Sequence, residues 1–274
     1  MKLAKHRWLG AALALTWAVP FNFHDSTPRM NFLKRVEDGQ ALFESRCRNQ
    51  AGVRIYKTVA DVDGLLLLKV RPVRGERELN DPHWPGAAFG REYTGEAYIA
   101  SFLGYEHPVW GKSVSKQRRG MVTNVWSADA LPGYRWVETL GVDGVSRTRH
   151  VLVERSVTPL PVGQFGEKRM LPSANKALES KASSAPRPRY GVTFEDHVTP
   201  EDRALWGAGS TVKVVDLQTN ELLAEMTRYG ISLLQSRYSA AWLNHSTCPE
   251  VGVSGDQAST RQFVDRVLIP LRTG

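Results

Sequence analysis

The chain has 274 residues, of which 42% are apolar and 23% are charged, and its formal net charge is +8. This is an ordinary globular composition, sufficient for one large domain or two small ones. Beyond the first twenty-odd residues no apolar run approaches the length of a membrane span, which excludes an integral membrane domain there.

The pattern of charged and apolar residues over positions 1–23 predicts that the protein is exported. Lys2, Lys5 and Arg7 precede twelve uncharged residues that run from Trp8 to Val19, and the loss of these three charges would leave a net +5. A positive start followed by a short apolar run is typical of a signal peptide. Proline follows that run where a small residue is usual at a cleavage site, so an uncleaved anchor also fits. We therefore expect a protein that is exported, and either periplasmic or anchored at the outer face of the inner membrane.

Cys47 and Cys248 are the only cysteines of the chain. An even number of cysteines in an exported protein favours a disulfide, with two separate buried thiols as the alternative. The bridge would close a loop of about 200 residues, for which the chain-entropy model gives roughly 4 to 5 kcal/mol. It would also hold both ends of the mature chain together, and we expect one α+β domain over residues 26–274.

A helix is predicted between Thr27, a capping residue, and Gly52, a helix-ending residue. Gly39 weakens its middle, so two shorter helices are the alternative. One stripe of residues recurs at spacings of 3 and 4: Leu33, Val36, Gln40, Phe43 and Cys47. This periodicity places Cys47 on a buried face.

A β-hairpin is predicted next. Residues 53–62 alternate, Asp63 and Gly64 form a two-residue turn, and residues 65–71 return. The returning strand contains four consecutive leucines, which cannot all face one side. We therefore expect it at the centre of the sheet, covered on both faces.

The following stretch, residues 72–120, is rich in turn formers, and further strands are predicted at residues 121–127, 134–140 and 145–159. The segment at about 172–189 consists mainly of Ser, Ala, Lys, Arg and Pro, and contains no aromatic residue. Such a composition buries little, so we expect a surface linker with at most one helical turn.

The C-terminal part alternates strands and short helices. A strand at residues 190–198 precedes a short helix capped by Thr199, and residues 211–217 and 221–229 form a hairpin. Ser259 and Gln262 predict a capping box for a last helix, whose packing stripe is Phe263, Val264, Val267 and Leu268. The predicted fold class is therefore α+β: an antiparallel sheet built from hairpins, with an N-terminal and a C-terminal helix packed on it.

Four segments are similar to a family of uncharacterised exported proteins and lipoproteins of proteobacteria. They are residues 47–59, 189–196, 209–221 and 247–249, so both cysteines lie in matching segments. Some members begin with a lipidated cysteine, which this chain lacks. The resemblance supports export and implies no activity.

Binding residues are predicted in the region from Trp84 to Trp136, which holds ten of the 25 aromatic residues of the chain. Aromatic loops with glycine can present a stiff contact surface, although the same rings can instead fasten irregular loops to the sheet. A basic cluster in this region suits solvated surface or an anionic partner. Our candidate binding residues are Trp84, Phe89, Tyr93, Tyr105, Trp110, Lys112, Lys116, Arg118 and Arg119.

Catalytic and metal motifs are weak. His245, Ser246, Ser254 and Asp256 could supply a hydrolytic group, but the spacing around Ser254 is not that of a nucleophile elbow. No two histidines stand three or four residues apart, and no cofactor motif is present, so we expect neither metal nor cofactor.

These observations predict an exported, non-enzymatic binding protein of the cell envelope that contacts another protein. An immunity-type inhibitor of an envelope toxin is one concrete version. The alternatives are a protein that binds cell-wall glycan or anionic lipid, and a hydrolase using the 245–256 loop. Export disfavours a nucleic-acid partner.

Overall fold

The computed structural model describes residues 27–108, 119–123, 132–154, 176–233, 240–249 and 257–271. The helices are α1 (Thr27–Asn49), α2 (Glu76–Asn80), α3 (Gly95–Leu103), α4 (Pro200–Ala204) and α5 (Ser259–Val264), with 3₁₀ helices η1 (Pro85–Phe89) and η3 (Ala241–Leu243). The strands of the first half are β1 (Gly52–Ile55), β2 (Val59–Val62), β3 (Gly64–Leu67), β4 (Tyr105–Pro108), β5 (Arg119–Thr123), β6 (Trp136–Leu140) and β7 (Arg147–Glu154). Those of the second half are β8 (Lys176–Ala182), β9 (Tyr190–His197), β10 (Gly207–Asp216), β11 (Glu221–Ile231), β12 (Ser246–Cys248) and β13 (Leu268–Pro270).

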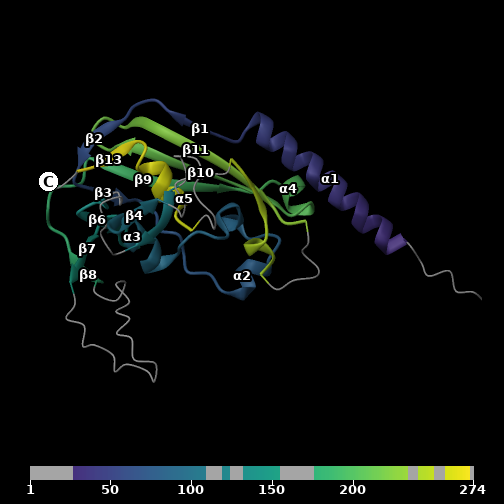
Figure 1. Cartoon of the computed structure of the whole chain (residues 1–274), viewed down its shortest axis with the longest axis horizontal. Helices are drawn as coiled ribbons and strands as arrows, with labels where there is room; N and C mark the ends of the chain where they lie inside the picture. Colours follow the sequence, from purple (N-terminus) through teal and green to yellow (C-terminus); the bar gives the residue numbers. More distant parts are fainter. Residues whose placement is uncertain are drawn as a thin grey trace, which may run out of the picture.

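One large sheet organises the molecule (Figure 1). Within the described ranges its strand order is β1-β11-β10-β9-β3-β6-β7-β8, and β12 also pairs with β11. Most neighbours are antiparallel, whereas β3 runs parallel to both β6 and β9. A mixed α+β fold with a large, mostly antiparallel sheet and few helices is therefore confirmed.

The leucine-rich strand lies where its sequence predicts. Leu65, Leu66 and Leu67 are fully buried, and β3 sits between β9 and β6 in the middle of the sheet. These residues form the core together with Phe102, Met226 and Trp242, among others. Helix η1 packs on β9, β10 and β11, and α3 packs on β6 and β7. Continuous apolar sequence thus marks a strand buried on both faces.

The predicted hairpin around Asp63 and Gly64 is wrong. Strand β2 pairs in parallel with β13, whereas β3 enters the large sheet, so Asp63 connects two different sheets. Gly64 serves close packing instead of a turn, because a Cβ there would lie 2.2 Å from Cδ2 of Trp136. The parallel partners of both strands are remote in sequence, and a turn motif carries no information about them.

Helix α1 is continuous from Thr27 to Asn49 and extends past the end of the sheet in Figure 1. Gly39 is a point of close approach, since a Cβ there would lie 3.1 Å from Cδ1 of Ile231 in β11. The predicted stripe is only partly covered: Leu33 remains 51% exposed, and Cys47 is half-buried. The helix therefore docks through its C-terminal half, and the predicted stripe is partly buried there and exposed at Leu33.

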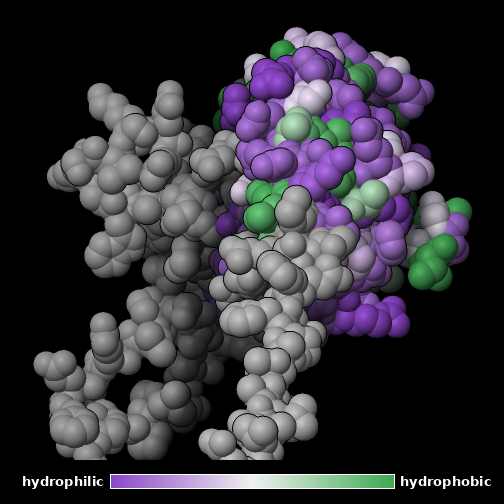
Figure 2. All heavy atoms as spheres, turned by 90° about the vertical axis from the view of Figure 1, so that its right-hand side faces the viewer, coloured by the Kyte–Doolittle hydropathy of each residue, from purple (hydrophilic) through white to green (hydrophobic). Residues whose placement is uncertain are grey.

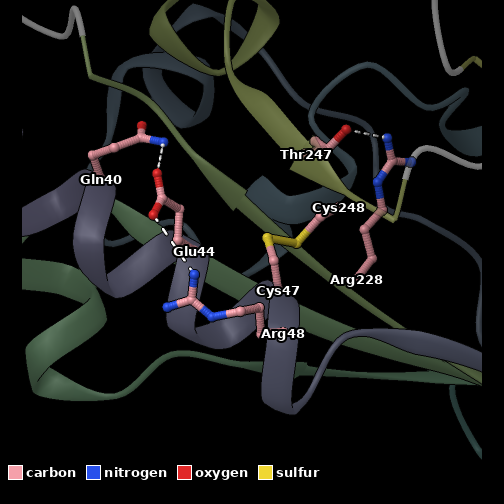
Figure 3. Close-up of a disulfide and its surroundings, with 7 residues drawn as sticks. All are labelled: Gln40, Glu44, Cys47, Arg48, Arg228, Thr247 and Cys248. Atoms are coloured by element: carbon pink, nitrogen blue, oxygen red, sulfur yellow. Dashed lines mark hydrogen bonds and ion pairs between the residues drawn. A yellow bond between two sulfur atoms is a disulfide. The ribbon is translucent and has the colours of Figure 1, made fainter.

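The predicted disulfide is confirmed. Cys47 at the end of α1 is bonded to Cys248 in β12, with 5.7 Å between the Cα atoms, and Figure 3 shows the bridge joining the helix to the sheet. It connects residues that are 201 positions apart. A disulfide is compatible with an oxidising compartment.

Two further sequence predictions need correction. The segment at about 172–189, expected as a surface linker, contains the edge strand β8, which pairs with β7 over its whole length. Its weak strand propensity is overridden by the partner strand, while its side chains stay largely accessible. The capping box of α5 is absent: Ala258 is the N-cap, and the Ser259 hydroxyl accepts from Arg228 instead.

Other local predictions are confirmed. Thr199 accepts a hydrogen bond from the backbone N–H of Asp202 at 3.1 Å, which caps α4. Strands β10 and β11 pair antiparallel on either side of the 218–220 turn.

In the described ranges no helix has the length and apolar character that crossing a membrane requires. The face shown in Figure 2 is mainly hydrophilic, with small scattered apolar areas.

Candidate functional site

A cavity of about 180 Å³ opens between the segment that follows β3, helix η1, the start of α3 and strand β9. Two of the predicted binding residues, Trp84 and Phe89, line it, while the rest of its lining was not singled out from sequence. The described residues that line it are Arg71, Pro72, Arg74, Trp84, Pro85, Gly86, Phe89, Thr94 and Asp196. We call this cavity the arginine pocket.

The floor of the arginine pocket is a buried ion-pair network. Arg71 is only 3% exposed, and its Nε lies 3.3 Å from Oε2 of Glu92 while Nη1 lies 2.9 Å from Oδ1 of Asp196. Its third nitrogen, Nη2, donates to Oγ of Ser210 at 3.2 Å. Each of the three guanidinium nitrogens therefore donates a hydrogen bond within the protein. Arg71 forms part of the floor of the pocket and is not the residue that we expect to bind a ligand.

Aromatic rings hold that guanidinium in place. The Arg71 Cζ lies 3.7 Å from the ring centroid of Phe194 and 4.2 Å from that of Phe89. Arg228 lies 5.1 Å from the Phe89 centroid. Phe89 is therefore both a core residue, 2% exposed, and the bottom of the pocket. Stacking of this kind fixes a planar cation in one orientation.

The C-terminal helix completes the network from behind. Glu92, which is 2% exposed, accepts hydrogen bonds from the backbone N–H of Thr260 at 2.6 Å and from its hydroxyl at 2.8 Å. Burial raises the pKa of Glu92, and the charge of Arg71 and the bonds from Thr260 oppose that rise. Helix α5 therefore holds Glu92 in place beside Arg71, although the three residues are far apart in the sequence.

The mouth of the pocket differs from its floor. Arg74 is half-buried, its guanidinium lies 5.9 Å from the ring centroid of Trp84, and no described carboxylate lies within ion-pair distance of it. Burial lowers the pKa of Arg74, the positive charge of Arg71 lowers it further, and Glu92 acts in the opposite direction. A partly desolvated cation without a counter-ion is unfavourable on its own and suits an anionic ligand.

Small residues and an uncommitted hydroxyl complete the mouth. Gly86 lets the Trp84 ring lie close to the backbone, because a Cβ there would be 2.9 Å from the ring. Thr94 is the N-cap of α3, yet its side chain makes no capping hydrogen bond. The exposed Val73, at 78%, lies beside Arg74 in the sequence. Among the described residues, the pocket therefore combines a cation without an ion pair, a hydroxyl and an apolar rim.

The remaining candidates from the aromatic region fall into three groups. Tyr93 is half-buried, and its hydroxyl donates to Gln257 at 3.2 Å. The backbones of Tyr105 and Arg119 lie in the paired strands β4 and β5, and nothing is described of their side chains. Trp110, Lys112, Lys116 and Arg118 lie outside the described residues. Tyr98, Phe102 and Tyr134 are core residues, which matches the alternative in which rings fasten loops to the sheet.

A second cavity, of about 430 Å³, lies where β2 and β3 meet the 185–190 segment. Trp136 lines this cavity and is half-buried, with the guanidinium of Arg149 at 4.2 Å from its ring centroid. Arg149 is in turn held by the fully buried Glu138 at 2.9 Å. The charge of Arg149 is therefore compensated, unlike that of Arg74.

The loop considered for hydrolysis is only partly described. His245 is 4% exposed, its ring packs edge-on against Trp242, and neither ring nitrogen has a hydrogen-bond partner in the described structure. Burial lowers the pKa of His245 to about 3, and the charges of Arg91 and Arg228 lower it further. Ser246 is exposed, and Ser254 and Asp256 lie outside the described ranges. In the described part of the chain no three His, Cys, Asp or Glu residues are grouped as metal ligands.

Sequence reasoning missed Arg71, Arg74 and Asp196. The available signal was an arginine close behind four leucines, because charge next to a doubly buried strand requires a partner. No protein-family model, no curated protein and no solved structure matches the chain. Function therefore has to be inferred from the geometry of the sites.

Proposed function

We propose that this chain is an exported, non-enzymatic binding protein of the cell envelope that contacts another protein through the mouth of the arginine pocket. An immunity-type inhibitor that blocks an envelope toxin is one concrete version. The observation that carries the proposal is Arg74, a half-buried cation with no carboxylate partner among the described residues, stacked at 5.9 Å on Trp84. Arginine and tryptophan are the residues that most often dominate binding energy in protein interfaces.

The surroundings of Arg74 favour protein contact over the glycan or anionic-lipid alternative. Pro72, Val73 and Pro85 are exposed around it, so one cation sits within an apolar rim. Charged polymers and lipid surfaces are usually bound by several cations in a row. A rigid floor also lowers the entropy cost of binding.

Capture from envelope extract tests the proposal. The tagged protein should retain one stoichiometric partner, and Arg74→Gln or Trp84→Ala should lose it. Arg77→Gln is the matched control, because the side chain of Arg77 is 93% exposed and contacts only Glu78 among the described residues. Absence of any partner, or equal capture by wild type and Arg74→Gln, would overturn the proposal.

A further inference from the structure

We infer that the arginine pocket binds a single carboxylate carried on an apolar stem, with Arg74 as the residue that contacts the anion. This inference rests on the proposed function and names the chemistry by which the partner protein is recognised. The carboxylate would belong to a glutamate or aspartate side chain of the partner, or to its C-terminus.

The charge of the pocket selects a monoanion. Arg71 forms ion pairs with Asp196, which lines the pocket, and with Glu92 behind it, so Arg74 is the lining cation that has no ion pair with a described carboxylate. The nitrogens of Arg71 already donate to Glu92, Asp196 and Ser210. The guanidinium fork of Arg74 matches both oxygens of one carboxylate.

The walls select an apolar stem. Pro72, Pro85, Trp84 and Phe89 line the cavity, and its volume of about 180 Å³ limits the ligand to a small group. Thr94 contributes a hydroxyl that the N-terminus of α3 does not use. A phosphate dianion would need more donors than one guanidinium and one hydroxyl, and would leave the apolar walls unused. A carboxylate at the end of an aliphatic stem uses both parts of the pocket.

Calorimetric titration with acetate, butyrate and hexanoate tests this chemistry. Affinity should rise with stem length, by about fourfold for each buried methylene. Hexanol and inorganic phosphate should bind far more weakly than hexanoate. Arg74→Gln should weaken hexanoate binding by about 10- to 100-fold, the usual effect of losing a hydrogen bond to a charged group, while Arg74→Lys should fall between the two.

Controls separate binding from folding. Arg77→Gln should bind hexanoate like wild type, and circular dichroism with thermal melting should show that Arg74→Gln is folded. Equal hexanoate affinity of wild type and Arg74→Gln, or equal affinity for hexanol and hexanoate, would overturn the inference. Two blocked peptides identify the source: one whose only carboxylate is an internal glutamate, and one whose only carboxylate is its C-terminus.

The two proposals fail in different ways. If envelope extract yields a partner that saturating hexanoate does not displace, the carboxylate inference is wrong and the proposed function stands. If hexanoate binds through Arg74 and no envelope protein is captured, the carboxylate inference stands and the proposed function is wrong.

Discussion

Removing the disulfide should destabilise the protein mainly through its unfolded state. Cys47 and Cys248 close a loop over 201 positions, and the chain-entropy model then gives about 5 kcal/mol for the double variant Cys47→Ser, Cys248→Ser. The native structure should survive, because other contacts hold the end of α1. The Tyr229 hydroxyl donates to Oε1 of Gln50 at 2.5 Å, and Arg46 lies 3.2 Å from Asp202.

Urea denaturation of the oxidised wild type and the double variant measures this effect. In thermal unfolding, the same loss of about 5 kcal/mol corresponds to a fall in Tm of about 10 to 20 °C for a domain of this size. The denatured state should also become more expanded, so the slope of unfolding free energy against urea should increase. Thiol titration should find no free thiol in the native wild type and two after reduction. A loss below about 1 kcal/mol with an unchanged slope would refute the reasoning.

Three further predictions concern single side chains. Gly64→Ala should lose about 2 kcal/mol or more in denaturant unfolding, because its Cβ would lie 2.2 Å from Trp136, whereas Gly207→Ala, with 3.4 Å to its nearest contact, should be nearly neutral. Glu138→Gln should lose about 3 kcal/mol by the same measurement, since it leaves two partly exposed arginines without their carboxylate, and a loss under 1 kcal/mol would contradict this. His245 has a pKa of about 3 in the folded state against about 6.5 unfolded, so the unfolded state binds the extra proton on acidification, and stability should fall by about 3 kcal/mol from pH 7 to pH 4. His245→Phe should remove this part of the pH dependence, and an unchanged profile would show that His245 is not its source.

Local signals predicted much of the fold because they act within a few residues. The Thr199 cap, the 218–220 turn and the leucine run each determine structure at the place where they occur. The errors arose where structure depends on remote partners. Strand β8 forms because β7 pairs with it along its whole length. Strand β2 does not form the expected hairpin with β3 because it pairs with β13. Sequence periodicity carries no information about such pairings.

The candidate site shows the same division. Aromatic enrichment singled out a region that includes Trp84 and Phe89, but it could not separate Phe89 and Tyr98, which are core, from Trp84, which lies at the pocket mouth. Burial of a ring is decided by the sheet that packs against it. Arg74 lacked any distinguishing local pattern, since its interest arises only once the carboxylates near it are seen to be bonded to Arg71.

This contrast between two neighbouring arginines also argues for a binding role. Arg71 is buried with every nitrogen committed, so its network can be explained by stability alone. A structural role for Arg74 would require a partner that offsets its partial desolvation. The described residues offer the face of Trp84 at 5.9 Å and the charge of Glu92, and the pKa of Arg74 is still lowered by burial. A cation held in this way costs stability in the free protein. Functional sites are where such local costs persist, because a ligand recovers them on binding. Arg74→Gln should therefore be at least as stable as wild type in the absence of ligand, whereas a purely structural arginine would lose stability on the same change.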